Sequence, residues 1–164
     1  MMAASLAAIG CFIDLFSKSW VFNWLGPPTT GRIHWLLPNH IGLQTSLNTG
    51  ALFGMGQGGV GVLAIISLLA AIGVFVWLTW GGASHDRFIS FVLGLITGGI
   101  LGNMYDRMGL WGTQAVRDWI LFQYNEQYVW PNFNIADSLL VVGAGLMMWH
   151  AFRQDAIEKR NAEA

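Results

Sequence analysis

Residues 103–137 read NMYDRMGLWGTQAVRDWILFQYNEQYVWPNFNIAD, and this stretch joins two strongly apolar segments of the chain. It contains four of the nine acidic residues in the sequence, namely Asp106, Asp118, Glu126 and Asp137. Its centre is rich in Trp and Tyr, residues that favour the interface between a membrane and water. Carboxylates beside apolar segments are costly in lipid, so these acids are candidates for a functional site.

The composition is that of an integral membrane protein. The chain has 164 residues, of which 54% are hydrophobic and only 10% are charged, whereas about 25% of residues are charged in a typical soluble domain. A net charge of −1 and eight scattered basic residues exclude a nucleic-acid-binding surface. The single cysteine, Cys11, has no partner for an internal disulfide, and no Cys/His set suggests a metal site.

Four apolar runs predict four transmembrane helices, because about 20 helical residues cross the hydrocarbon core of a bilayer. The predicted spans are residues 3–24, 58–80, 88–108 and 135–152. Two longer outer segments, residues 25–57 and 109–134, share one side of the membrane. We therefore expect one membrane-embedded domain over residues 1–164, in which residues 153–164 form a polar tail.

Both outer segments contain strand patterns. Residues 41–47 alternate between apolar and polar side chains, and residues 32–36 are their predicted pairing partner. Residues 119–124 and 127–130 flank a predicted hairpin turn at Asn125-Glu126. The predicted fold class is thus an all-α integral membrane protein with a small β-sheet on the membrane surface and an aromatic loop.

An even number of spans places both termini on one side and the charged residues near the opposite membrane face. The basic residues divide four against three between the two sides, which favours cytosolic termini by the positive-inside rule. The residues that come to the outer face are Asp14, Lys18, Asp106, Arg107, Asp118 and Asp137.

Two carboxylates held close together share a proton near neutral pH, because they cannot both ionise cheaply. One then activates water as a base while the other protonates the reacting carbonyl. Asp118 and Asp137 are the attractive pair for this aspartic-protease chemistry, which needs no metal. The loop between them allows one to fold over the other.

Structural roles also explain these residues. Asn134 and Asp137 have the spacing of a helix N-cap and its third residue. Asp106 and Arg107 with Asn103 fit a local knot at a helix end, and Asp118 fits a solvated acid beside Arg117. Asp14 and Lys18 fit an i, i+4 ion pair whose lysine extends toward the interface. The pattern alone indicates a membrane protein with a polar site at its outer face.

Four motifs follow one another along the chain: DLFSK at residues 14–18, NTGALFG at 48–54, GGILGNMYDR at 98–107 and FNIAD at 133–137. In this order they resemble the motifs of the lipoprotein signal peptidases (signal peptidase II), and the resemblance extends over nearly the whole length of the chain. Each motif alone is weak, whereas the ordered set is highly specific.

The resemblance implies a membrane aspartic endopeptidase that removes the signal peptide from diacylglyceryl-modified prolipoproteins, cutting before the lipidated cysteine. It implies Asp118 and Asp137 as catalytic residues and no metal or cofactor. It also implies a monomer in the bacterial cytoplasmic (inner) membrane, in contact with membrane lipid, with cytosolic termini and an extracytoplasmic site. The segment 29–56 is similar to a substrate cradle, and the aromatic loop to a flexible lid. Residues with an implied role in supporting the site or binding substrate are Asn48, Gly50, Asn103, Arg107, Asn134, Ala136, Asp14, Lys18 and Asp106.

The sequence departs from this family around the first catalytic acid. The segment from Arg107 to Asp118 is longer than usual, and Arg117 stands where an apolar residue is typical. A cation there lowers the pKa of Asp118 if it points inward, and Asp106 is then the alternative first acid. Two other functions compete with the peptidase: an ion or proton carrier that uses the charges of helices one and three, and a non-catalytic helical scaffold.

Overall fold

The computed structural model describes residues 1–50, 58–125 and 127–162. In these residues, one strand pair follows the first of four long helices and the other precedes the last, and short 3-10 helices lie at Pro28–Thr30 and Ala83–His85. The long elements are α1 (Met2–Leu25), β1 (Ile33–Leu37), β2 (Ile41–Asn48), α2 (Val60–Thr79), α3 (Arg87–Arg107), β3 (Val116–Asn125), β4 (Tyr128–Phe133) and α4 (Ile135–Ala162).

The four predicted spans are confirmed as helices. All four are long and apolar enough to cross a membrane. The fourth differs from the prediction, which ended it at residue 152, because α4 continues to Ala162. Residues 153–162 contain neither glycine nor proline, and Asp155 pairs with Lys159 one turn later at 2.8 Å. The polar tail is therefore a helical extension, since good helix formers and an i, i+4 pair support it.

The strands form one antiparallel sheet in the order β1-β2-β3-β4. Both predicted pairings are confirmed, and Asn39 makes the β1–β2 turn with a φ of 59°. Glu126, half of the other predicted turn, lies outside the described residues. The sequence predicted two separate strand pairs, but β2 also pairs with β3, so both outer segments build a single sheet.

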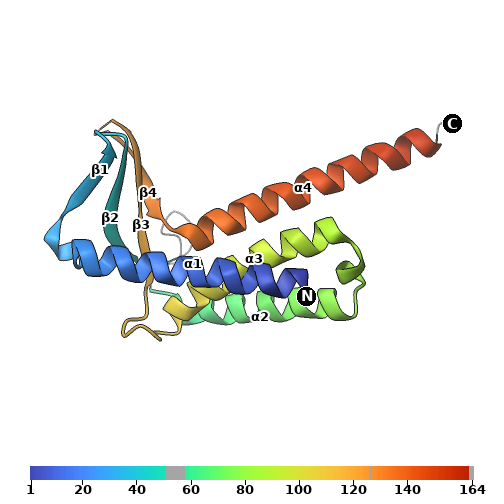
Figure 1. The fold of residues 1–164 in the computed structure, drawn as a ribbon, viewed down its shortest axis with the longest axis horizontal. Coiled ribbons are helices and arrows are strands. Elements are labelled where there is room, and N and C mark those ends of the chain that lie inside the picture. Colours follow the sequence, from blue (N-terminus) through green and yellow to red (C-terminus); the bar gives the residue numbers. More distant parts are fainter. Residues whose placement is uncertain (51–57, 126, 163–164) are drawn as a thin grey trace.

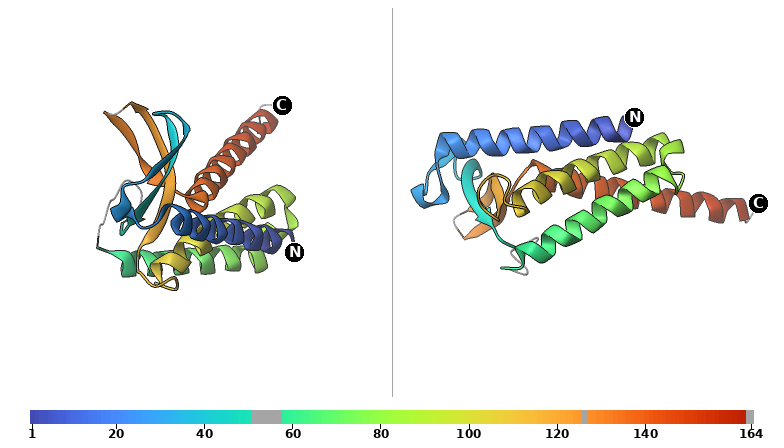
Figure 2. Two further views of the ribbon diagram at one scale, coloured as in Figure 1. Left: turned by 60° about the vertical axis from the view of Figure 1, so that its left-hand side comes forward. Right: turned by 90° about the horizontal axis from the view of Figure 1, so that it is seen from below.

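The sheet stands at one end of the helical bundle, and both termini lie at the other end (Figure 1). Figure 2 shows the same separation from two further sides, with the end of α4 extending beyond the other helices. The predicted clustering of the outer segments at one end is therefore correct. Val21 and Leu25 of α1 pack with Leu43 of β2, and Trp119 of β3 lies against them. This small apolar core anchors the sheet to the bundle.

Glycines allow α1 and α4 to approach α3 closely. A Cβ on Gly98 would lie 3.2 Å from the carbonyl oxygen of Ala7, and one on Gly102 would meet the carboxylate of Asp14. A Cβ on Gly99 would similarly meet Ala136 at the start of α4. Small residues of this kind permit close helix packing in lipid. The close approach brings polar residues of three helices together beneath the sheet.

Candidate active site

Asp118 enters the site from β3, at the point where this strand meets the helical bundle. Its side chain is buried, with 2% of its surface exposed. Oδ1 of Asp118 accepts a 2.6 Å hydrogen bond from Nδ2 of Asn134, and the side chain of Asn48 is a second hydrogen-bond partner. The alternative of a solvated loop acid is therefore wrong for Asp118.

Asp137 enters from the first turn of α4 and is half-buried. Its backbone N–H donates to Oδ1 of Asn134 at 2.9 Å, while its own Oδ2 accepts from the backbone N–H of Asn134 at 3.1 Å. This reciprocal pair is a capping box, as the spacing predicted. The helix cap fixes the Asp137 carboxylate and does not remove it from the site, because its Oδ1 faces Asn103.

Two asparagines connect the two carboxylates. Nδ2 of Asn103 donates to Oδ1 of Asp137 at 2.8 Å. Nδ2 of Asn134 donates both to Oδ1 of Asn103, at 3.1 Å, and to Asp118. The chain Asp118–Asn134–Asn103–Asp137 therefore links β3, α3 and α4 through side-chain hydrogen bonds. The structure brings together the two acids that the sequence analysis selected.

Lys18 holds this network from below. It is fully buried, and its Nζ donates to Oδ1 of Asn103 at 2.9 Å. The same ammonium pairs with Oδ2 of Asp14 at 2.6 Å and Oδ2 of Asp106 at 3.3 Å. The possibility that Lys18 extends outward to the interface is thus wrong. Oδ1 of Asp14 accepts from the backbone N–H of Ala136 at 2.8 Å, which attaches α1 to the start of α4.

Asp106 is buried, and its partner differs from the sequence expectation of a knot with Arg107. It accepts from the backbone N–H of Arg117 at 2.9 Å and from that residue's guanidinium at 2.7 Å and 3.1 Å. Arg117 thus turns away from Asp118 toward Asp106 and is 4% exposed. The condition for a lowered pKa of Asp118, an Arg117 side chain that points toward it, is therefore not met, and Arg117 is not among the groups that shift this pKa.

Arg107 lies on the other side of the site and lines a cavity of about 500 Å³. Its Nε is buried and has no hydrogen-bond partner among the described residues. Asp137 and Asp118 are the acids whose charges act most strongly on it. The cavity is lined by Asn48, Asn103, Arg107, Val116, Trp130, Pro131, Asn132, Phe133, Asp137, Ser138, Leu140, Val141 and Val142. Most of this lining is apolar, and its polar members include Asp137 and its hydrogen-bond partner Asn103.

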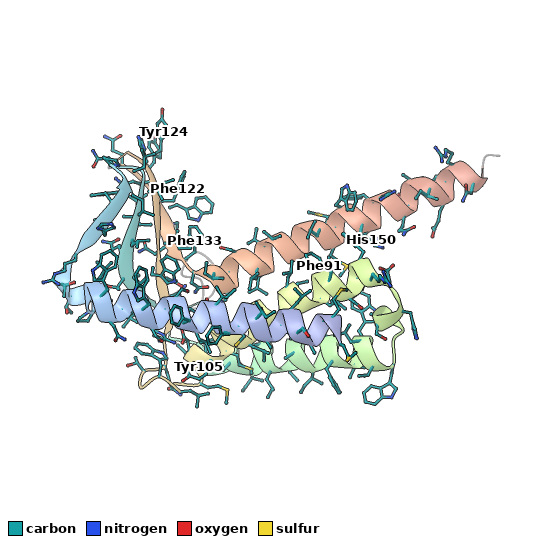
Figure 3. All side chains as sticks on the ribbon, viewed as in Figure 1. Phe91, Tyr105, Phe122, Tyr124, Phe133 and His150 are labelled. Atoms are coloured by element: carbon teal, nitrogen blue, oxygen red, sulfur yellow. The ribbon has the colours of Figure 1, made fainter. Side chains whose placement is uncertain are left out.

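Asn48 and Gly50 lie where β2 ends beside the cavity. Oδ1 of Asn48 accepts from the backbone N–H of Gly50 at 2.9 Å, which fixes the amide group that contacts Asp118. Residues 51–54 of the same sequence motif lie outside the described residues. Figure 3 shows Phe133 where β4 passes into α4, with Phe122 and Tyr124 farther out toward the tip of the sheet.

The electrostatics of the site distinguish Asp118. Burial raises the pKa of its carboxyl group to about 7, and the nearby charge of Asp137 acts in the same direction. Hydrogen bonds from Asn48 and Asn134, and the charge of Lys18, oppose this rise in pKa. Desolvation disfavours the carboxylate more than these partners stabilise it. Asp118 is consequently placed to carry a proton near neutral pH.

Sequence reasoning missed the contribution of Arg117. Its guanidinium also donates to Oγ of Ser19 at 3.1 Å and lies 4.8 Å from the ring centroid of Trp111. One signal in the sequence could have pointed to Arg117. The acids Asp14 and Asp106 outnumber Lys18, so the cluster needed a second positive charge. Metal ligands form no cluster in the part of the chain that the structure describes: no group of three or more His, Cys, Asp or Glu residues is suitably placed.

Comparison with known proteins identifies sequence relatives over most of the chain. The family model for signal peptidase II matches residues 6–153. A lipoprotein signal peptidase of Rhodopirellula baltica is 44% identical over 155 residues, which cover 90% of this chain and 70% of that protein. A lipoprotein signal peptidase of Symbiobacterium thermophilum is 34% identical over 153 residues, covering 92% and 93% of the two chains.

Two solved structures share the fold. Both are bacterial membrane enzymes determined by the in meso method. One superposes with a TM-score of 0.81 over 93% of this chain and 88% of its own, at 22% sequence identity. The other has a TM-score of 0.76, with 91% of each chain covered and 23% identity. The arrangement of four helices and an end sheet is therefore shared with known membrane enzymes.

Proposed function

Because the chain belongs to the signal peptidase II family, we propose that it removes signal peptides from prolipoproteins with Asp118 and Asp137 as an aspartic catalytic pair. One observation carries this proposal above the others. The two carboxylates lie at one end of the helical bundle, linked through Asn134 and Asn103, beside a largely apolar cavity. Such a site combines proton transfer with room for a lipid-anchored peptide.

The two acids take different roles in the first step. Asp137 is the carboxylate: it accepts N–H hydrogen bonds from Asn103 and Asn134 and removes a proton from the attacking water. Asp118, whose pKa is raised to about 7, donates its proton to the oxygen of the scissile carbonyl. Attack by the water oxygen then gives a neutral tetrahedral intermediate, with Asp137 protonated and Asp118 ionised.

The second step restores both groups. Asp137 returns its proton to the amide nitrogen of the leaving residue, and Asp118 accepts a proton from a hydroxyl of the intermediate. The carbon–nitrogen bond breaks, which releases a carboxylic acid and an amine. Two carboxyl groups that share one proton thus perform both steps without a covalent intermediate. The lysine–asparagine network below them keeps the donors in place while the proton moves.

The cavity fits the substrate that the family name implies. Apolar side chains of α4, including Leu140, Val141 and Val142, line it on one side, and Trp130 and Phe133 line it from β4. We assign this apolar part to the signal helix and the diacylglyceryl chains, and the part beside Asp137 to the scissile bond. Arg107 and Asn48, which lie near the two acids, are assigned to binding the carbonyl groups of the substrate backbone.

Amide variants test the catalytic pair. Asp118→Asn and Asp137→Asn should each lower the rate of prolipoprotein cleavage by about 10²–10⁴-fold, the usual effect of losing a general acid or base. Purified protein in liposomes with a diacylglyceryl-prolipopeptide provides the measurement. Asp155→Asn is the matched control, because that carboxylate is exposed on the extended part of α4. Wild-type cleavage by either site variant would exclude that residue from the pair.

We also propose that the sheet and the catalytic pair face the extracytoplasmic side of the inner membrane, with cytosolic termini. This orientation fits the proposed function. A substrate that is anchored in the membrane by its lipid and signal helix presents its cleavage site at the membrane surface, where the sheet and the catalytic pair would then lie. In a Cys11→Ser background, Tyr124→Cys at the exposed tip of the sheet should react with a membrane-impermeant maleimide on intact spheroplasts. Lys159→Cys should react only after the membrane is opened, and the reverse pattern would overturn the orientation.

A further inference from the structure

Arg117, which directly precedes Asp118 in β3, connects this strand to α3, to α1 and to Trp111. Its guanidinium pairs with Asp106 of α3 at 2.7 Å, donates to Ser19 of α1 at 3.1 Å and lies over the ring of Trp111. Its backbone N–H donates to the other carboxylate oxygen of Asp106 at 2.9 Å. Trp111 is itself held by a hydrogen bond from Nε1 to the carbonyl oxygen of Ala115. Backbone and side chain of one residue are therefore both attached to α3.

The sheet holds this part of β3 along one edge only. Arg117 and Asp118 pair with Leu47 and Ser46 of β2. Between the pairs Leu43–Ile120 and Ser46–Asp118, two residues of β2 face one residue of β3, so a bulge beside Asp118 interrupts the ladder. On the other edge, pairing of β3 with β4 begins at Ile120 and does not reach Asp118. The contact with α3 is therefore a second attachment of β3 at this point.

Arg117 also balances the buried charge beneath the site. Asp14, Asp106 and Lys18 are fully buried and together carry one negative charge, while Arg117 adds the second positive charge. An uncompensated buried charge is strongly unfavourable, and a paired one is tolerated. Two guanidinium nitrogens donate to Oδ1 of Asp106, and this rigid pair of donors fixes the direction of the side chain better than an ammonium does.

We propose that Arg117 is a positioning residue of the peptidase, which clamps β3 to α3 through Asp106 and so places Asp118 against Asp137 and the scissile bond. This inference rests on the proposed catalytic role of Asp118. Consecutive strand residues point to opposite sides. The Arg117 side chain accordingly faces the helices while Asp118 faces Asn134. A displacement of about 1 Å at a catalytic group is enough to lower a rate 10²-fold.

Two charge-balanced variants test the clamp without leaving an unpaired buried charge. In the double variant Arg117→Met with Asp106→Asn, the amide at position 106 still accepts from the backbone N–H, but the guanidinium contacts are lost. In Arg117→Lys the charge remains, and the pair of guanidinium donors to Oδ1 of Asp106 is lost. We expect kcat to fall about 10–100-fold in the double variant and less in Arg117→Lys, with KM within about twofold of wild type in both.

The measurement is the cleavage of one diacylglyceryl-prolipopeptide in liposomes. The kcat is calculated per molecule of folded enzyme, as determined by size-exclusion chromatography. Arg153→Met is the matched control, since Arg153 likewise lies over a tryptophan, Trp149, but on the extended part of α4. Its kcat should equal that of wild type. Unchanged kcat in both Arg117 variants, or a loss confined to KM, would overturn the positioning role.

Asp118→Asn is measured in parallel to separate this inference from the proposed function. If Asp118→Asn is inactive and the Arg117 variants match wild type in kcat, the clamp is wrong and the catalytic pair stands. If Asp118→Asn itself cleaves normally, the proposed catalytic role fails and the clamp fails with it.

Discussion

The side-chain amide of Asn134 donates a 2.6 Å hydrogen bond to Oδ1 of Asp118 and so connects the first turn of α4 to β3. The same residue caps α4 through its exchange with Asp137. One asparagine therefore fixes the relative position of the two carboxylates by contacting both. Asn134 thus both caps a helix and contacts a candidate catalytic acid. The helix cap that the spacing predicted is therefore part of the site.

The activity should depend on the protonation of Asp118. Burial raises the pKa of this carboxyl to about 7, so the protonated acid is lost as the pH rises through that value. We expect kcat/KM to decline above about pH 7. A pH profile of prolipopeptide cleavage in liposomes checks this. An activity that is constant from about pH 6 to 9 would contradict the assignment of Asp118 as the acid.

The stability of the protein should reveal the same raised pKa. Between about pH 4, where an aspartate in the unfolded chain titrates, and pH 7, the folded state binds the extra proton. Stability contributed by this group is therefore greatest at low pH and falls as the pH rises. Asp118→Asn should raise the thermal midpoint in detergent micelles at pH 8 and change it little at pH 4. A stabilisation that is equal at both pH values would be inconsistent with this linkage.

Asn134→Asp separates the helix cap from the hydrogen bond to Asp118. Aspartate is a good N-cap residue, so α4 should still begin at Ile135. The amide donor is lost and a third carboxylate is placed beside Asp118. We expect thermal stability near that of wild type at low pH, with cleavage reduced at least about 10-fold because a donor to the catalytic network is missing. Asn134→Ala, which loses both functions, should lower stability as well, by about 1 kcal/mol for the cap.

Lys18→Met tests the buried charge cluster. The substitution leaves Asp14 and Asp106 opposite Arg117 alone, so we expect a loss of about 3–5 kcal/mol in the free energy of unfolding. The double variant with Asp14→Asn should recover a large part of this loss, because it restores charge balance. Unfolding in micelles provides the measurement. Lys159→Met is the control, and its exposed ion pair should contribute only a few tenths of a kcal/mol.

Gly102→Ala tests the close packing of α1 against α3. The added methyl would meet the carboxylate of Asp14 and lie 3.3 Å from Cβ of Ala136. We expect lower thermal stability together with lower activity, since α1 and the start of α4 must both move. Gly145→Ala is the control, because no atom lies within 4 Å of the added methyl. That substitution should stabilise the helix by about 0.5–1 kcal/mol. Equal effects of the two variants would refute the packing role of Gly102.

Most of the fold was predictable because membrane helices leave a simple signal. Lipid requires long apolar segments with internally satisfied backbones, so the four helices could be read directly from hydropathy. The end of α4 was not predictable by this rule, since residues 153–162 are polar and their helix depends on local pairs such as Asp155 with Lys159. The pairing of β2 with β3 was also missed, because strand patterns do not show which distant strand is the partner.

The sequence also indicated the site, but not the contacts within it. Motif order selected Asp118 and Asp137, and the structure links them through Asn103 and Asn134. The partner of Asp106 was assigned wrongly, because adjacency in the chain suggested Arg107. In the fold, the last turn of α3 faces β3, and Arg117 reaches Asp106 from eleven positions away. The lid role of the aromatic loop, the oligomeric state and the orientation remain predictions.

The sequence by itself determined that this chain has four helices long and apolar enough to cross a membrane, and that Asp14, Asp106, Asp118 and Asp137 gather at one end. Both follow from the cost of placing charge and unpaired backbone in lipid, which is a property of each segment alone. Only the tertiary structure decided the surroundings of each acid, and these surroundings differ between Asp106 and Asp118. Asp106 is neutralised by Arg117 and Lys18, whereas Asp118 is buried with amide partners and a second carboxylate nearby. That difference arises from contacts between distant segments, so it appears only when the chain is folded.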